Sequence, residues 1–138
     1  MPPHLNEWFA SKPHPVFVHS ALGSFAFEGG VWTSDIPQGA HSLELSLAGG
    51  ESAPYEKLVT AAAALLERFA EVKDTAIAFL TSQDEAPSRE DFICHSMELL
   101  REDAPNHFSL SFILFGDLGG IWRVEFEDGV PIFLARDD

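Results

Sequence analysis

The chain has 138 residues, 46% of them hydrophobic with twelve Phe and three Trp, which is enough apolar material for the core of one domain and argues against disorder. Eight Lys and Arg against 22 Asp and Glu give a formal net charge of −14. This charge argues against electrostatic binding to nucleic acid or to an anionic membrane, and it favours a basic partner.

Sequence features that report on location point to the cytoplasm. The single cysteine, Cys94, forms no internal disulfide, which suits a reducing compartment. The first residues lack the basic start and apolar run of a signal peptide, and no later segment reaches the roughly 18 apolar residues of a spanning helix. We expect a cytoplasmic, soluble protein with one domain over residues 1–138. Residues 1–14 are expected to form an N-terminal arm, with Trp8 and Phe9 packing onto the body or onto a second subunit.

The first third of the chain has the alternation and turn residues of antiparallel strands. Short strands rich in aromatic and β-branched residues are predicted over residues 16–18, 24–28 and 31–33. Gly29-Gly30 is predicted to form a hairpin turn, because glycine reaches positive φ without strain. Residues 35–39 are predicted to form a loop. Residues 42–47 alternate leucine with polar side chains, which predicts a half-buried strand.

Residues 55–72 form the clearest amphipathic helix of the chain. Its apolar side chains fall on one helical face: Leu58, Ala62, Leu65, Leu66 and Phe69. Asp74 is predicted to be the N-cap of a second, angled helix. The spacing from Ser88 to Asp91 is typical of a capping box and predicts a short helical turn.

The last part of the chain returns to a strand pattern. Residues 92–100 fit both a helix and a strand, and we predict a helical turn that passes into a strand near His95. Three clearer strands are predicted to form an antiparallel meander, with turns at residues 116–120 and 128–129: residues 108–114, 122–127 and 130–135.

This order of elements predicts an α+β domain with a mostly antiparallel sheet. A β-meander, two helices and a second β-meander follow one another, and the helices are expected to pack on one face of the sheet. The other face is expected to be open to water and to carry polar side chains: Glu44, Ser46, Ser109, Ser111, Arg123, Glu125 and Glu127.

No motif in the sequence predicts catalysis, a cofactor or a metal ion. Cys94 and His95 are neighbours, and on a strand or a helix their side chains diverge, so Cys94 is interpreted as a buried structural cysteine. The six histidines lack the short spacings of zinc sites, which leaves a long-range assembly of His19, His41 and His107 with a carboxylate as the metal alternative. We therefore assign no catalytic, cofactor-binding or metal-binding residue. The chain is not interpreted as an enzyme, although that question stays open.

Acidic side chains are concentrated between Asp84 and Asp103, where seven carboxylates occur. They form either a solvated surface or a docking surface for a basic partner. The residues assigned to such a docking surface are Glu98, Glu102, Asp103, Glu125 and Glu127.

Several short features recur in the same order in a known group of proteins. They are Leu22-Gly23, Phe25, Trp32, the strand Leu43–Leu47, the long helix, Glu90, Phe92, Met97-Glu98-Leu99, Gly116-Asp117 and Asp128-Gly129. In these features the chain resembles a family of small uncharacterised bacterial α+β domains, some of which are predicted immunity proteins of polymorphic toxin systems. Gly120-Ile121-Trp122 stands where members of that family tend to have a Gly-His pair. The resemblance implies a fold and an immunity-type role, and it carries no activity.

Three functional hypotheses follow. The leading one is a non-catalytic, acidic protein-binding module of immunity type, which covers a basic protein and binds neither nucleic acid nor membrane. The second is a structural homo-oligomer, such as a homodimer formed through a free sheet edge or the N-terminal arm. The third is a small-ligand-binding or enzymatic domain with a pocket between helices and sheet, near Trp32, Trp122 and one or more histidines.

Overall fold

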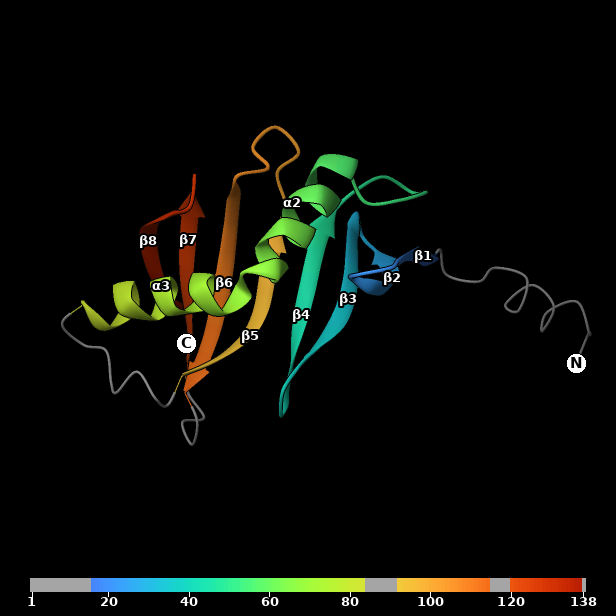
Figure 1. Ribbon diagram of the computed structural model, residues 1–138. Coiled ribbons are helices and arrows are strands. Elements are labelled where there is room, and N and C mark those ends of the chain that lie inside the picture. Colours follow the sequence, from blue (N-terminus) through green and yellow to red (C-terminus); the bar gives the residue numbers. More distant parts are fainter. Residues whose placement is uncertain (1–15, 84–91, 115–119, 138) are drawn as a thin grey trace, which may run out of the picture.

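The computed structural model describes residues 16–83, 92–114 and 120–137, and it shows an eight-stranded sheet with two helices (Figure 1). The strands before the helices are β1 (Val16–His19), β2 (Gly23–Glu28), β3 (Val31–Gln38) and β4 (His41–Ala48). The helices are α2 (Glu56–Glu67) and α3 (Phe69–Thr81). The strands after them are β5 (Phe92–Leu99), β6 (His107–Leu114), β7 (Ile121–Glu127) and β8 (Val130–Asp137). The predicted α+β class with a mostly antiparallel sheet is confirmed.

The strands lie in the sheet in the same order as in the sequence, from β1 to β8. Neighbouring strands are antiparallel except for β4 and β5, which are parallel. A parallel pair needs a long crossover connection, and the segment containing α2 and α3 supplies it. The two helices therefore divide the sheet into two antiparallel halves that meet at the β4–β5 pair.

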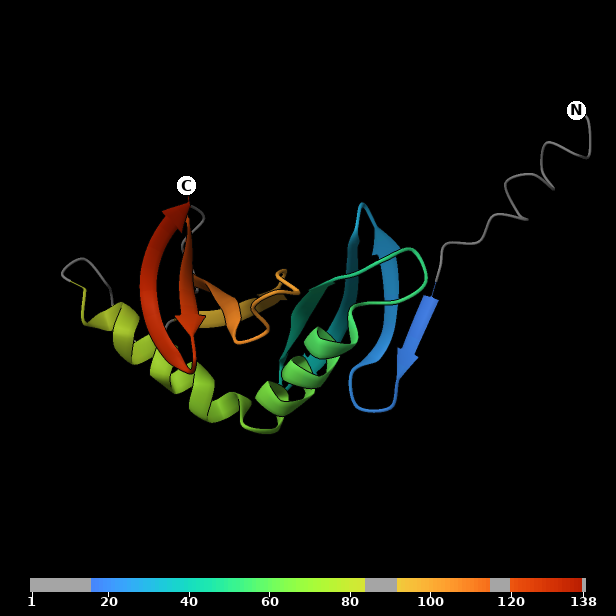
Figure 2. The same ribbon diagram turned by 90° about the horizontal axis from the view of Figure 1, so that it is seen from above.

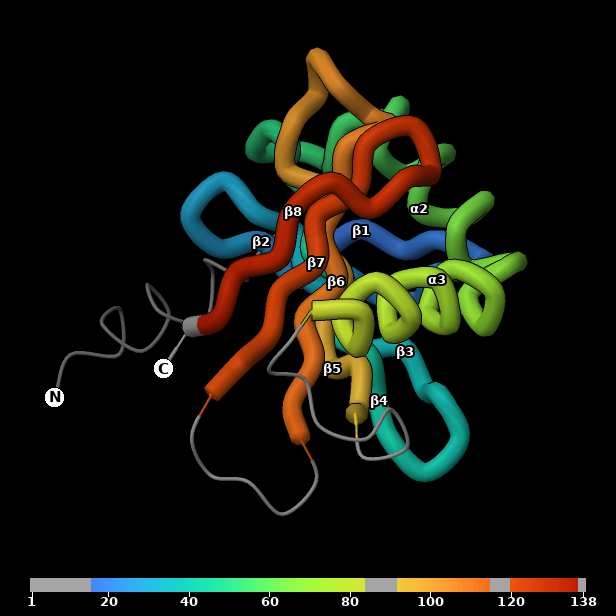
Figure 3. Tube along the Cα trace, turned by 90° about the vertical axis from the view of Figure 1, so that its left-hand side faces the viewer, coloured from blue at the N-terminus to red at the C-terminus, as the bar shows by residue number. Residues whose placement is uncertain are grey.

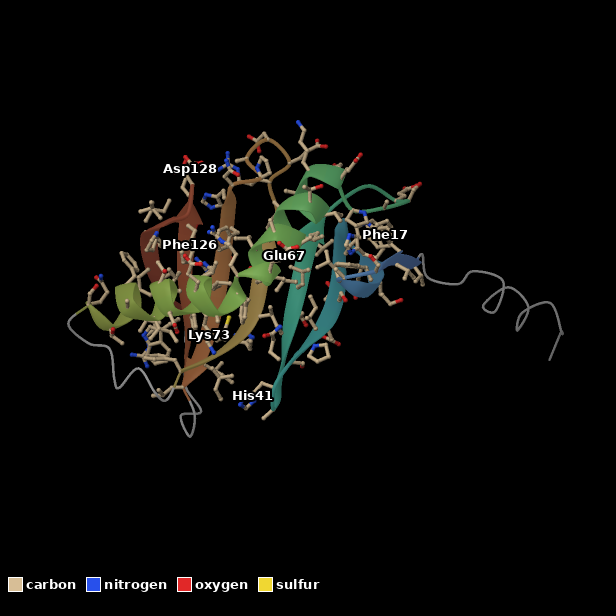
Figure 4. The ribbon with its side chains drawn as sticks, in the orientation of Figure 1. Phe17, His41, Glu67, Lys73, Phe126 and Asp128 are labelled. Carbon is tan, nitrogen blue, oxygen red and sulfur yellow. The ribbon has the colours of Figure 1, made fainter. Side chains whose placement is uncertain are left out.

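Both helices lie on the same side of the sheet (Figures 2 and 3). Helix α2 contacts β4, and α3 contacts β7 and β8. The buried residues that the helices contribute include Leu58, Ala62, Val72, Ala76, Ile77 and Leu80. Phe17 on β1 and Phe126 on β7 lie toward the two ends of this core (Figure 4). In the described part of the chain, no helix or strand covers the opposite side of the sheet.

The helical segment breaks six residues earlier than the sequence predicts. Arg68 has φ −125° and ψ 34°, which ends α2, and α3 begins at Phe69. The predicted single helix over residues 55–72 and the predicted N-cap at Asp74 are therefore wrong, because Asp74 lies inside α3. The periodicity of the apolar residues continues through the break, so it gives no sign of the change in direction. The change lets α3 reach β7 and β8, in the other half of the sheet.

Residues 35–38 belong to β3, and the predicted loop there is wrong. Pro37 lacks an N–H group and is disfavoured in a central strand. However, β2 pairs with β3 only as far as Thr33, so Pro37 lies where one side of β3 has no neighbouring strand. The hairpin turn follows at Gly39, whose φ is +62°.

Residues 92–99 form one strand, so the predicted helical turn before His95 is also wrong. The register between β5 and β6 shifts between Cys94 and Ser96, which leaves His95 as an extra residue. A β-bulge of this kind breaks the two-residue alternation. Phe92 and Cys94 precede the break in phase with the core, and Met97 follows it in phase with the core. The mixed sequence pattern reflects this bulge.

Some predictions fall on residues outside the described ranges. They are the N-terminal arm over residues 1–14, the turn at Ser88–Asp91 and most of the turn at residues 116–120. Among the helices that the structure describes, none has the length and apolar character needed to cross a membrane.

Candidate functional site

The face of the sheet opposite the helices is strongly acidic. Strand alternation, shifted in β5 by the bulge at His95, places six carboxylates of β2, β3, β4, β5 and β7 on this face. They are Glu28, Asp35, Glu44, Glu98, Glu125 and Glu127. We call this set of six carboxylates the acidic face. Arg123 is the one Lys or Arg that the described strands place among them.

The helices carry no comparable excess of charge. From Glu56 to Thr81 there are four carboxylates, Glu56, Glu67, Glu71 and Asp74, and three cations, Lys57, Arg68 and Lys73. The difference is one negative charge, against five on the acidic face (six carboxylates minus Arg123). The negative charge of the described part of the protein is therefore concentrated on the uncovered side of the sheet.

Two carboxylates of the acidic face are direct neighbours on adjacent strands. Asp35 on β3 lies opposite Glu44 on β4, and Glu98 on β5 lies one diagonal step further. Like charges directly opposite each other destabilise a sheet, by an amount on the order of 0.2–1 kcal/mol. Within the described residues, no Lys or Arg forms an ion pair with Asp35, Glu44 or Glu98. The fold therefore retains a repulsive arrangement that it does not neutralise internally.

Glu125, in contrast, is held by neighbouring side chains. His107 Nε2 lies 3.2 Å from Glu125 Oε1, and Arg123 Nε lies 3.7 Å from Glu125 Oε2. Ser109 lies between Glu98 and Glu125 in a single cross-strand row. These side chains line a shallow groove of about 280 Å³, with Leu100 and Arg101 at its end. In the β5–β7 part of the acidic face, Glu125 is thus held by two neighbouring side chains, whereas within the described residues Glu98 and Glu127 form no ion pair.

Three serines of the same sheet face are nearly buried; Ser96 lies opposite Ser111, and Ser46 lies opposite Glu98. Ser46, Ser96 and Ser111 are only 5%, 9% and 7% exposed, although their positions alternate away from the helix side. The sequence correctly predicts that Ser46 and Ser111 lie on this face, but the expectation that they are open to water is wrong. Larger neighbouring side chains of the same face shield these small ones.

His95 is the bulged residue of β5 and lies between two carboxylates of the acidic face. Its Nε2 atom is buried and has no hydrogen-bond partner within the described residues. Burial lowers the pKa of His95 below 6.5, while the charges of Glu44 and Glu98 act in the opposite direction. His95 is therefore neutral at pH 7, and it leaves the charge of Glu44 and Glu98 uncompensated.

Cys94 lies on the other side of β5 and has the structural role that the sequence predicts. Its side chain is 8% exposed within the core, and burial raises the pKa of the thiol to about 12. Cys94 and His95 occupy opposite faces of the strand. The thiol is therefore protonated at neutral pH, and the neighbouring imidazole is not placed to deprotonate it.

Of the five residues that the sequence assigns to a docking surface, three lie on the acidic face and two lie outside it. Glu98, Glu125 and Glu127 lie on the acidic face. Glu102 and Asp103 lie on the exposed loop between β5 and β6, where Arg101 Nη2 donates to Asp103 Oδ2 at 3.3 Å. That hydrogen bond lowers the pKa of the exposed Asp103 carboxyl.

Four members of the site are not assigned to it from the sequence: Glu28, Asp35, Glu44 and His95. Asp35 was placed in a loop because Pro37 obscured the strand, and His95 was placed at a change of secondary structure. Glu44 was predicted on the correct face, but its position opposite Asp35 depends on strand pairing. The signal for Asp35 in the sequence is its position between Ser34 and Ile36, which are less exposed than Asp35.

The other candidate chemistry gains no geometric support. Trp32 and Trp122 are 0% and 6% exposed and belong to the core. His19 Nδ1 accepts hydrogen bonds from the backbone N–H groups of Ala21 and Leu22. Over residues 16–83, 92–114 and 120–137, no three His, Cys, Asp or Glu side chains gather in a way that could hold a metal ion.

Comparison of the chain with known protein families, characterised proteins and solved structures found no match.

Proposed function

We propose that this protein is a non-catalytic binding module whose acidic face binds a basic segment of another protein. The observation that carries the proposal is the Asp35–Glu44 pair, with Glu98 beside it, for which the described residues supply no neutralising Lys or Arg. Such an arrangement costs stability in the isolated protein. A bound Arg or Lys side chain would offset this repulsion, so the complex would be free of the destabilisation that the isolated protein carries.

The distribution of charge supports the same proposal. Six carboxylates face one guanidinium on the uncovered side of the sheet, whereas the helices are nearly balanced. A surface of one sign attracts an oppositely charged partner and orients it during the encounter. The partner should therefore approach the sheet and leave the helices exposed.

The partner chemistry fits an immunity-type role, in which an acidic protein covers the basic surface of a toxin or enzyme. The resemblance of the sequence to a bacterial family that includes predicted immunity proteins motivates this part of the proposal. In such a complex Glu98 and the unpaired carboxylates on β3 and β4 would contact basic side chains of the partner.

The proposal is tested by capture from the cells in which the protein is made. The tagged protein is used as bait at about 0.05 M and 0.3 M salt, since exposed charge attraction is screened over about 10 Å at 0.1 M. Two triple variants are compared with the wild type. One removes three charges from the acidic face, Asp35→Asn with Glu44→Gln and Glu98→Gln, and the other removes three from the helices, Glu56→Gln with Glu67→Gln and Glu71→Gln.

Both triple variants change the net charge equally, so only the position of the charge differs. We expect one predominant basic protein to be captured, with its affinity weakened about tenfold or more by the acidic-face variant and little changed by the helix variant. Equal weakening by both variants would mean that only bulk charge matters. Unchanged capture by the acidic-face variant would eliminate this surface as the binding site.

A further inference from the structure

A second candidate site lies on the helix side of the sheet, away from the acidic face. Three segments that are distant in the sequence meet there: the second half of α2, the loop before β6 and the turn between β7 and β8. They enclose a groove of about 440 Å³, which is in the size range of small-molecule sites, about 300–1,000 Å³. Asp128, one of the lining residues, is labelled in Figure 4.

The floor of the groove is apolar. Ala61 and Ala64 lie on one side of α2, three residues apart, and their small side chains leave room above Phe108. The Phe108 ring is 3% exposed and stacks on Phe126, with ring centroids 4.6 Å apart and an interplanar angle of 10°. This stack fixes the floor, so the groove offers a preformed surface for an apolar group.

One wall of the groove carries an unpaired cation. Arg68, at the junction of α2 and α3, is exposed, and within the described residues its guanidinium forms no ion pair and no hydrogen bond. Glu71 and Arg68 both line a smaller hollow of about 60 Å³, but the two side chains form no ion pair with each other. The Arg68 guanidinium is therefore available to a carboxylate, which it can bind through two parallel N–H groups.

Another part of the lining of the groove carries an anchored carboxylate. Asn106 Nδ2 donates to Asp128 Oδ1 at 3.0 Å, and the Asp128 backbone N–H donates to the Asn106 carbonyl at 3.3 Å. These two bonds fix Asp128 on the β7–β8 turn, where its φ is +52°. Within the described residues, Asp128 Oδ2 has no partner, so it is available to a donor in the groove.

We propose that this groove binds a small zwitterion with an apolar body, of the apolar amino acid or dipeptide type. The ligand carboxylate binds Arg68, the ligand ammonium binds Asp128, and the apolar side chain lies over Phe108. A simple anion fits the molecule less well, because the net charge of −14 repels it. A zwitterion carries no net charge, and it pairs with both the Arg68 guanidinium and the Asp128 carboxylate.

The test is direct binding of named probes to the full chain. L-leucine, L-phenylalanine and the dipeptide Leu-Phe are titrated to about 10 mM and followed by ligand-observed NMR, since weak small-ligand sites have dissociation constants in the millimolar range. N-acetyl-phenylalanine amide keeps the apolar body and lacks both charges. Arg68→Gln and Asp128→Asn each remove one charge from the groove, and Asn tolerates the positive φ of position 128.

Matched variants outside the groove control for net charge. Lys57→Gln removes a cation from α2, and Asp74→Asn removes a carboxylate from α3. Thermal unfolding of each variant checks that the fold is kept; the Arg68 and Asp128 side chains are both exposed, so we expect it to be.

We expect at least one zwitterionic probe to bind, with affinity reduced about tenfold or more in both Arg68→Gln and Asp128→Asn and unchanged in the two controls. Failure of all three zwitterions to bind would overturn the proposal. Equal binding of the capped amide would overturn it as well, because the charges would then be unused. Loss in Arg68→Gln alone would overturn the zwitterion assignment.

Discussion

At the residue scale, Glu44 should show opposite effects on stability and on binding. Replacing Glu44 by Gln removes its repulsion with Asp35, so we expect the free energy of unfolding to rise by about 0.5 kcal/mol. The same substitution should weaken capture of the basic partner. Urea unfolding measures the first effect, with Glu67→Gln on α2 as the control. A loss of stability in Glu44→Gln would show that Glu44 is a supporting residue of the fold.

His95 gives a second residue-scale prediction, which concerns pH. Its pKa in the folded protein lies below 6.5, so below pH 6.5 the unfolded chain takes up a proton that the folded protein resists. Stability therefore falls as pH decreases through 6.5 toward the folded pKa. We expect the wild type to lose more unfolding free energy than His95→Gln between about pH 7.5 and about pH 5.5. Parallel curves for the two proteins would contradict the buried, neutral state of His95.

The residues of the acidic face illustrate what alternation alone predicts. Glu125 and Glu127 alternate with the apolar residues of β7, so their side of the sheet follows from sequence. Asp35 and His95 do not, since each lies beside a local irregularity, Pro37 or the bulge. Side chains of the acidic face that lie at irregular positions are thus the ones that periodicity misses.

At the element scale, the connection from β4 to α2 depends on close backbone packing at Gly49. A Cβ atom at Gly49 would lie 2.5 Å from Pro54 Cα and 2.7 Å from Trp32 Cδ1. The Trp32 Nε1–H group also donates to the Gly50 carbonyl at 2.8 Å, which fixes the loop against the core. We expect Gly49→Ala to lower the free energy of unfolding by about 1–3 kcal/mol.

Gly50→Ala is the matched control, because an added Cβ there meets nothing within 4 Å and φ is not in the left-handed region. Chemical denaturation of both variants measures the difference in their free energies of unfolding. Equal stability of the two variants would show that the loop moves away from Trp32 at little cost.

The break between α2 and α3 shows the limit of element-scale prediction. The amphipathic face is continuous from Leu58 to Phe69, so the sequence predicts one helix. Tertiary packing instead favours two helices, because α2 covers β4 and α3 covers β7 and β8. No Pro or Gly marks the break at Arg68, and the sequence offers no local reason for it.

At the scale of the whole molecule, the class of fold follows from the order of strand and helix patterns, whereas the pairing does not. Seven strand pairs join β1 to β8, and the one parallel pair, β4 with β5, depends on where the chain returns after α3. Hydrophobic alternation is the same for a parallel and an antiparallel neighbour. Glu44 and Glu98 lie close together at the centre of the acidic face, and this could therefore not be predicted from the sequence.

Net charge gives a prediction for the whole molecule. With a formal charge of −14, the compact state is destabilised by self-repulsion, and salt should relieve it. We expect the free energy of unfolding to increase from about 0.02 M to about 0.3 M NaCl. The acidic-face triple variant should show a smaller increase than the helix triple variant, as measured by urea unfolding at each salt concentration. Identical salt dependence of the two variants would contradict the concentration of repulsion on the acidic face.

The measurement that tests the central claim most directly is an NMR footprint of the captured partner on the protein. Backbone amide signals are followed while the unlabelled basic partner is added at moderate salt. We expect the perturbed residues to lie on β3, β4, β5 and β7, centred on Asp35, Glu44 and Glu98, with the outer surfaces of α2 and α3 unchanged. Perturbations centred on the helices, with the sheet signals unmoved, would contradict the acidic face as the binding surface.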